Sequence, residues 1–165
     1  MIRCDMKSRR DIVRIKIKIK NVLAAFIAAV MVLTFAACVG DTKYPVPKSK
    51  DGEFRFALTE VGHGRAHFYS YRHDGVNIDF FVRKDSGGKY TAYFDACFVC
   101  YRYKKGYIVE GSDLVCVECK KHFPIPDKEW EDIVGCAPID LIGEVRGDVF
   151  VVKVDDVIRG EVLFK

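Results

Sequence analysis

The sequence C-F-V-C at residues 97–100 is followed, after fifteen residues, by C-V-E-C at residues 116–119. Two residues between the cysteines let both sulfurs of a pair turn inward from one tight turn, so each pair can chelate a metal. A single pair is weak evidence, but two pairs at this separation favour four thiolates converging on one centre. We therefore predict a metal or cluster site formed by Cys97, Cys100, Cys116 and Cys119.

The residues between the two pairs favour changes of chain direction. Lys104-Lys105-Gly106 and Glu110-Gly111-Ser112-Asp113 are both rich in turn-forming residues. The segment from Gly106 to Cys116 is therefore predicted to fold as a hairpin that brings the second pair beside the first. Because a strand is predicted immediately before the first pair, at residues 90–94, we expect the cysteine loops at the end of a sheet.

Residues 76–83 give the clearest strand signal in the chain. Apolar side chains alternate there with polar ones, the apolar set being Val76, Ile78, Phe80 and Val82 and the polar set Asn77, Asp79 and Arg83. This period of two is typical of a strand with one buried face, although Phe81 interrupts the polar face. Further strands are predicted at 53–58, 66–71, 90–94, 149–154 and 162–164, with one short helix between Asp127 and Gly135. We therefore predict a mainly β fold.

Composition and charge separate the N-terminal leader from the rest of the chain. The protein has 165 residues, of which 50% are hydrophobic, so it can bury a substantial core. Its net charge is +4, but residues 1–38 contain eight Lys or Arg and only two Asp. The rest of the chain holds 19 basic and 21 acidic residues. Because a nucleic-acid-binding domain needs a basic surface of its own, we expect no nucleic acid partner.

The leader has the order of charges that is typical of export. All eight of its basic residues lie between Arg3 and Lys20, and Val22 to Gly40 follow without a charge. This apolar run is long for a cleaved signal peptide and long enough to span a bilayer as a helix. We therefore expect a protein of the cell membrane whose domain faces outside the cytoplasm.

The form of attachment stays open. Phe35-Ala36-Ala37-Cys38 is similar to a bacterial lipoprotein cleavage box, in which Cys38 becomes the lipidated first residue. An uncleaved helix and simple cleavage are the alternatives. The predicted organisation is a basic flank with a signal or anchor at 1–40, a tether containing Pro45 and Pro47 at 41–51, and a cysteine-rich metal-binding domain at 52–165.

Four thiolates suit zinc or an iron–sulfur cluster far better than calcium or magnesium. Two structural disulfides are the alternative, because oxidised cysteines are common outside the cytoplasm. A disulfide between cysteines three positions apart is geometrically awkward, although pairing between the two loops is feasible. The predicted domain has five cysteines, so complete pairing leaves one over. The spacing thus favours a metal or cluster.

Two further residues near the cysteines need an assignment. Cys136 is open as a fifth ligand, as a thiol that contacts the ligands, or as a small buried residue. Asp95 is predicted to accept backbone N–H bonds from the cysteine loop that follows it.

The remaining candidates for ligation or catalysis are weaker. His122 follows two lysines and is predicted to be exposed, while His63, His67 and His73 are scattered over strands and turns. There is no Ser-His-Asp set, Gly-rich phosphate loop or paired-carboxylate signature, so hydrolytic chemistry has no support in the sequence.

The residues around the cysteines also carry a family resemblance. The motifs are Phe94-Asp95-Ala96-Cys97-Phe98-Val99-Cys100-Tyr101, Lys105-Gly106-Tyr107, Val115-Cys116-Val117-Glu118-Cys119, Phe123-Pro124 and Gly135-Cys136-Ala137-Pro138. They resemble the FtrD-like membrane iron–sulfur protein family of bacteria, over roughly residues 52–165. The resemblance implies a membrane-attached protein with an iron–sulfur or related metal centre, associated with ferrous iron transport and electron transfer. The family usually has Gly where this chain has Lys120, and Gly-Gly-Cys-Asn-Pro where it has Val134 to Pro138.

The layout of strands and loops also resembles a Rieske-type domain, which implies a β-sandwich carrying the two Cys-x-x-Cys loops. Rieske centres use Cys and His in each loop, so four thiolates are expected to give a lower potential. The leading interpretation is an electron-transfer module with membrane redox or iron-transport partners, and an enzyme is less favoured. The alternatives are a structural zinc domain and a thiol-disulfide redox protein that uses Cys97-Cys100 or Cys116-Cys119.

Overall fold

The structure is a computed structural model that describes residues 42–127, 130 and 136–165. The leader, including Cys38, lies outside the described residues, as does most of the helix predicted between Asp127 and Gly135. Within the described ranges, no helix combines the length and the apolar character needed to cross a membrane.

The described residues of the domain form three antiparallel sheets. The outer sheet has the strand order β1 (Ser49–Lys50), β2 (Glu53–Ala57), β11 (Val149–Lys153) and β10 (Glu144–Arg146). The central sheet has the order β3 (Ala66–His73), β4 (Val76–Lys84), β5 (Tyr90–Cys97) and β9 (Pro138–Leu141). The ligand sheet has the order β6 (Tyr107–Glu110), β7 (Asp113–Cys116) and β8 (His122–Pro124). The predicted mainly β fold is confirmed.

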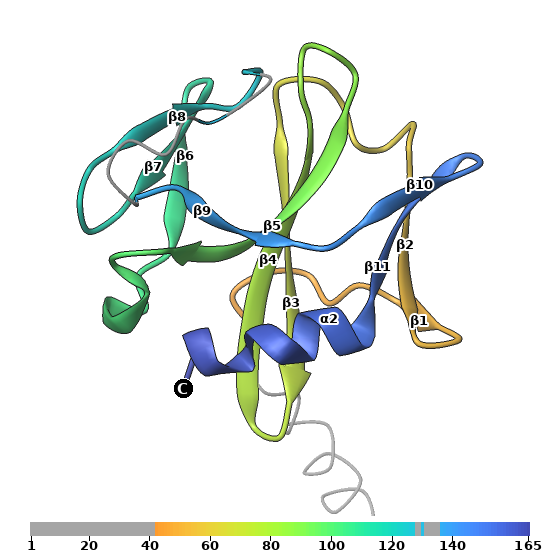
Figure 1. Cartoon of the computed structure of the whole chain (residues 1–165), viewed down its shortest axis with the longest axis horizontal. Helices are drawn as coiled ribbons and strands as arrows, with labels where there is room; N and C mark the ends of the chain where they lie inside the picture. Colours follow the sequence, from red (N-terminus) through yellow and green to blue (C-terminus); the bar gives the residue numbers. More distant parts are fainter. Residues whose placement is uncertain (1–41, 128–129, 131–135) are drawn as a thin grey trace, which may run out of the picture. The chain divides into compact units, whose positions relative to one another are not determined.

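Short helical turns complete the described elements. The 3-10 turn η2 (Tyr101–Tyr103) follows the first cysteine pair, and α2 (Val154–Arg159) and η3 (Gly160–Leu163) follow the last strand. Figure 1 shows the ligand sheet on one side of strands β3 to β5 and the outer sheet on the other. The likeness to a Rieske domain stays a prediction.

The central sheet has a hydrophobic core on each face, because its side chains alternate between the two faces. One core joins it to the outer sheet and contains, among others, Phe54, Phe56, Ile78, Phe80, Val82, Phe94, Phe150 and Val152. The second core joins it to the ligand sheet and contains Phe81, Cys97, Cys100, Tyr107, Leu114, Cys116, Phe123 and Ile125. The cysteines are therefore part of a packed core and not of a solvated loop.

The predicted polar face of the strand at 76–83 is wrong at Arg83. The ligand sheet and the chain after it cover that face, so Arg83 is fully buried, as is Phe81. The Arg83 guanidinium donates hydrogen bonds from Nη1 to the carbonyl oxygens of Ile125, at 2.5 Å, and Asp127, at 2.7 Å. It also stacks on the ring of Trp130, with Cζ 3.8 Å from the ring centroid. These contacts replace water for Nη1 and for one face of the guanidinium, whereas Nε and Nη2 have no hydrogen-bond partner among the described residues.

The strand predicted at residues 162–164 is also wrong. The chain is helical after Lys153, first as α2 and then as η3. Asp155 and Asp156 lie in the first turn of α2, where negative charge favours helix formation. Val157 is fully buried, and Leu163 packs against the core between the central and outer sheets. The apolar residues that suggested a strand therefore belong to a helical segment, which packs against the core.

The hairpin predicted between Gly106 and Cys116 is confirmed by the pairing of β6 with β7. β4 and β5 pair around the turn at 85–88, β6 and β7 pair around Gly111, and β10 and β11 pair around Gly147. The segment before β2 also contacts the domain, because the Tyr44 N–H donates to Ser70 Oγ at 3.1 Å and the Ser70 N–H donates to the Pro45 carbonyl at 3.1 Å. The boundaries proposed for the three segments of the chain stay a prediction.

Candidate metal centre

Four cysteine sulfurs gather where the central sheet meets the ligand sheet. The Sγ atoms of Cys97, Cys100, Cys116 and Cys119 all lie within 4.8 Å of one another. Cys97 ends β5 and Cys116 ends β7, so two strands from different sheets deliver the first cysteine of each pair. Cys97, Cys100 and Cys116 are buried, and Cys119 is the most exposed of the four. The two pairs converge, as the spacing predicted.

Each cysteine loop is closed by a backbone hydrogen bond across its pair. In the first loop, the Cys100 N–H donates to the Cys97 carbonyl at 3.1 Å. In the second, the Lys120 N–H donates to the Cys116 carbonyl at 3.0 Å. Lys120 has a φ of +58°, in the left-handed region that glycine adopts at least cost. A glycine at this position would adopt the same φ without strain.

Asp95 fixes the distance between the two cysteine loops. Its Oδ1 accepts a 2.6 Å hydrogen bond from the Tyr107 N–H, and the neighbouring Gly106 carbonyl accepts one from the Val117 N–H of the second loop at 3.0 Å. The predicted partner of Asp95 was therefore wrong: the N–H comes from the start of β6 and not from the adjacent cysteine loop. Residues 106 and 107 thus connect Asp95, which precedes the first cysteine loop, to Val117 in the second loop. This connection aligns one loop with the other.

Cys136 lies beside the four sulfurs without belonging to their group. Its carbonyl oxygen accepts hydrogen bonds from the Cys97 thiol, at 3.3 Å, and from the Tyr107 hydroxyl, at 3.0 Å. Its own thiol is half-buried. The backbone at residue 136 thus helps to position Cys97, while the role of the thiol stays a prediction.

The four thiols fit a tightly bound metal ion. A tetrahedral ion with metal–sulfur bonds of about 2.3 Å has sulfur–sulfur edges of about 3.8 Å, so the observed cluster needs only a small adjustment to hold one. To hold an iron–sulfur cluster, which is larger than a single ion, the four sulfurs would have to move farther apart. The chemistry of the ligands suits both a zinc ion and an iron–sulfur cluster, because all four ligand atoms are soft sulfurs.

The sequence comparison identifies the family. The family model described as membrane iron-sulfur containing protein FtrD-like matches residues 61–164. The chain belongs to the FtrD-like family. No curated protein sequence matches it. The matched range covers β3 to η3 and therefore includes both cysteine loops of this FtrD-like domain.

The thiols of the FtrD-like domain differ in acidity. Burial raises the pKa of Cys100, and it raises the pKa of Cys116 to about 11. Burial also acts on Cys119, but the Lys121 N–H and the neighbouring thiols outweigh it and lower the pKa of Cys119. Cys119 therefore forms a thiolate more readily than Cys100 or Cys116, and it is also the most exposed of the four.

The described histidines lie apart from the group of four thiols. His122 is exposed, as predicted, and its Nδ1 lies 3.0 Å from Asp113 Oδ2. His63 Nδ1 lies 2.9 Å from the Asp85 carbonyl oxygen. His67 and His73 are on β3, and neither is grouped with the thiols.

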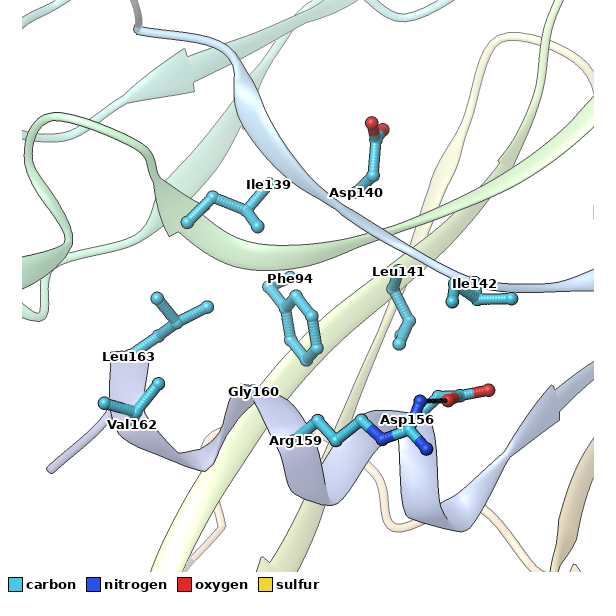
Figure 2. A pocket seen from close by; sticks show the side chains of 10 residues that line it. All are labelled: Phe94, Ile139, Asp140, Leu141, Ile142, Asp156, Arg159, Gly160, Val162 and Leu163. Carbon is cyan, nitrogen blue, oxygen red and sulfur yellow. Dashed lines mark hydrogen bonds and ion pairs between the residues drawn. The ribbon is translucent and has the colours of Figure 1, made fainter.

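A separate hollow of about 300 Å³ lies between β9 and the C-terminal helical segment (Figure 2). Figure 2 shows Phe94 and Leu141 on one side, Val162 and Leu163 on the other, and the Asp156–Arg159 ion pair at the rim. Its lining is Phe94, Ile139, Asp140, Leu141, Ile142, Asp156, Arg159, Gly160, Val162 and Leu163. Asp140 and Asp156 are the only side chains of this lining that could bind a metal, which is fewer than a metal site needs.

Proposed function

We propose that this FtrD-like chain is a membrane-attached, extracytoplasmic iron–sulfur protein that transfers electrons in association with iron transport. The observation that supports it is the convergence of four thiols within 4.8 Å in a chain of a membrane iron–sulfur family. Cys97, Cys100, Cys116 and Cys119 would hold the cluster, and a bound cluster would supply one-electron transfer.

The burial of the thiols suits this role. Three of the four sulfurs lie in a core with Phe81, Tyr107 and Leu114, which excludes water from most of the centre. The fourth, Cys119, is exposed and offers an edge through which an electron can pass to a partner. The partners we propose are membrane redox or iron-transport proteins.

A structural zinc site is the second candidate, and the size of the thiol group favours it. Sulfurs that are all within 4.8 Å of one another are already close to the edges of a single tetrahedral ion. In that case the metal serves to join the ligand sheet to the central sheet, because metal binding and folding are linked.

Metal analysis of anaerobically purified protein separates these functions. An iron–sulfur protein contains iron and acid-labile sulfide in similar amounts and shows a reversible paramagnetic signal on reduction. Zinc without sulfide would replace the electron-transfer proposal by the structural one. Metal-free protein with a reversible Cys97–Cys100 or Cys116–Cys119 disulfide would instead support a thiol-disulfide redox protein.

Attachment through the leader is tested by fractionation. We expect the protein in the membrane fraction, because residues 1–40 act as a lipidated signal or as an uncleaved helix. If Cys38 is lipidated, Cys38→Ser changes processing or releases the mature form, whereas an uncleaved helix is unaffected. Soluble native protein that starts after Gly40 would contradict both forms of attachment.

A further inference from the structure

Exposed apolar side chains concentrate at the metal centre. Ten large hydrophobic residues are exposed in the described part of the chain, and six of them fall between Phe98 and Val109. Four belong to the first cysteine loop and the turn after it, namely Phe98, Val99, Tyr101 and Tyr103. Phe98 is the most exposed of these, at 66%. We call residues 98–105 the loop-η2 surface.

The same surface is basic. Arg102, Lys104 and Lys105 are all exposed, and no acidic residue occurs between Ala96 and Val109. Lys105 pairs with Glu118 at 2.6 Å, whereas Arg102 lies over the ring of Tyr103 and Lys104 ends the η2 turn. The chain after Cys38 is slightly acidic, with 19 basic and 21 acidic residues. The loop-η2 surface is therefore a positive, aromatic projection on an acidic domain.

The chain enters the domain beside this surface. Lys43 Nζ and the Tyr44 hydroxyl donate to Asp95 Oδ2, at 3.0 Å and 3.1 Å. Lys43 also lines a small cavity, of about 50 Å³, together with Tyr101 and Lys104. The four residue steps from Gly40 to Tyr44 span at most about 14 Å. If residues 1–40 are attached to the membrane as proposed above, this short connection keeps the loop-η2 surface close to it.

We propose that the loop-η2 surface lies against an anionic lipid bilayer, with its aromatic side chains at the headgroup level and Arg102 and Lys104 on lipid phosphates. Tyrosine and other aromatic residues favour the membrane interface, and basic residues are attracted to anionic lipids. In Figure 1 the green turn between β5 and β6 projects away from the strands, which suits contact with a bilayer better than an extended protein interface. The inference depends on the proposed membrane attachment but not on which metal the cysteines bind.

Hydrogen–deuterium exchange of the full-length protein in nanodiscs tests this contact. One nanodisc contains only phosphatidylcholine and the other contains added phosphatidylglycerol. Peptides covering residues 98–105 should exchange about tenfold more slowly with phosphatidylglycerol, because the basic side chains hold the turn at the anionic surface. About 0.5 M salt should remove this difference, since it screens exposed charges.

Matched variants assign the effect to the surface. Arg102→Glu and Tyr103→Ser should each abolish the slower exchange, whereas Lys89→Glu and Val145→Ser, which change exposed residues elsewhere, should preserve it. Equal exchange in both nanodiscs, with the full-length protein incorporated, would overturn the proposal. Slower exchange that appears in native membranes but in neither nanodisc would overturn it in favour of an acidic protein partner. Soluble full-length protein would contradict the membrane attachment itself, whatever the metal content.

Discussion

A Cβ atom at Gly106 would lie 2.5 Å from both carboxylate oxygens of Asp95, and Gly106 has a φ of +62°. The glycine thus lets the backbone approach a buried carboxylate closely enough for the Tyr107 N–H to donate to it. Burial raises the pKa of Asp95, and this effect is opposed by Lys43, the Tyr107 N–H and Tyr44. At the residue scale, the spacing of the cysteine loops therefore depends on the absence of a side-chain methyl group at Gly106.

Gly106→Ala should destabilise the protein by about 2 kcal/mol or more, because the added methyl group meets Asp95 and the φ angle is unfavourable. Gly111→Ala is the control. Gly111 has nearly the same φ, +63°, but nothing lies within 4 Å of its Cβ position, so only the backbone strain of about 1 kcal/mol is expected. Denaturant unfolding measures both losses. Equal losses would show that the Asp95 contact is unimportant.

Replacement of single cysteines tests the ligand set. Cys97→Ser, Cys100→Ser, Cys116→Ser and Cys119→Ser should each lose most of the bound metal, because each removes one of four sulfurs that converge. Cys136→Ser should retain it, because Cys136 lies outside the group of four converging sulfurs and a serine hydroxyl can replace its thiol beside Cys119 and Cys97. Metal content per protein is the measurement. Equal loss in all five variants would make Cys136 a ligand, and full retention in the Cys97 and Cys116 variants would remove the site.

At the scale of elements, β4 joins the two cores and carries a buried charge. Phe80 faces the core of the outer sheet, whereas Phe81 and Arg83 face the ligand sheet. Arg83 binds two carbonyl oxygens of the chain after β8 and stacks on Trp130. Trp130 in turn donates from Nε1 to the Pro124 carbonyl at 2.8 Å. β4 therefore holds the ligand sheet through the planar guanidinium of Arg83 as well as through apolar contacts.

Arg83→Lys should cost about 2 kcal/mol, because lysine lacks the planar fork that allows stacking and donation together. Trp130 is the only tryptophan, so its fluorescence reports this site, and the emission should shift to longer wavelength as the ring loses its cover. Arg72→Lys makes the same change at an exposed position on β3 and should leave both stability and emission unchanged. Unaltered emission in Arg83→Lys would contradict the stacking role.

At the scale of the whole domain, the cysteines are distributed unequally between the two hydrophobic cores. In the part of the chain that the structure describes, the buried cysteines all belong to the core shared by the central and ligand sheets, and none belongs to the core under the outer sheet. Loss of the proposed metal should therefore destabilise the ligand sheet more than the outer sheet. Buried thiols without a metal would remain only in the core shared by the central and ligand sheets.

Removal of the metal by a strong chelator under reducing conditions should raise hydrogen exchange in β6, β7 and β8 by about tenfold or more, as expected for local unfolding. β2 and β11, which pair with each other in the outer sheet, should keep their protection. Mass spectrometry of peptides from the two regions measures the difference. A uniform increase over both regions would show that the two cores unfold together.

The sequence by itself determined the features that depend on neighbouring residues. The two cysteine pairs, the hairpin around Gly111 and the alternation over 76–82 are local patterns, because turn formation and the period of a strand involve only a few adjacent residues. The convergence of Cys97 with Cys116 was also predictable, since the hairpin between them is short. The apolar pattern alone did not distinguish a strand from a helix at 162–164.

Only the tertiary structure decided what covers each face and which distant groups meet. Arg83 is buried because chain from Tyr107 onward packs over a strand face that looks polar in the sequence. Asp95 meets Tyr107 and Lys43, which lie 12 and 52 residues away along the chain. Such contacts arise from the packing of separate segments, where the burial of apolar surface sets the arrangement and polar groups then take the partners that remain within reach.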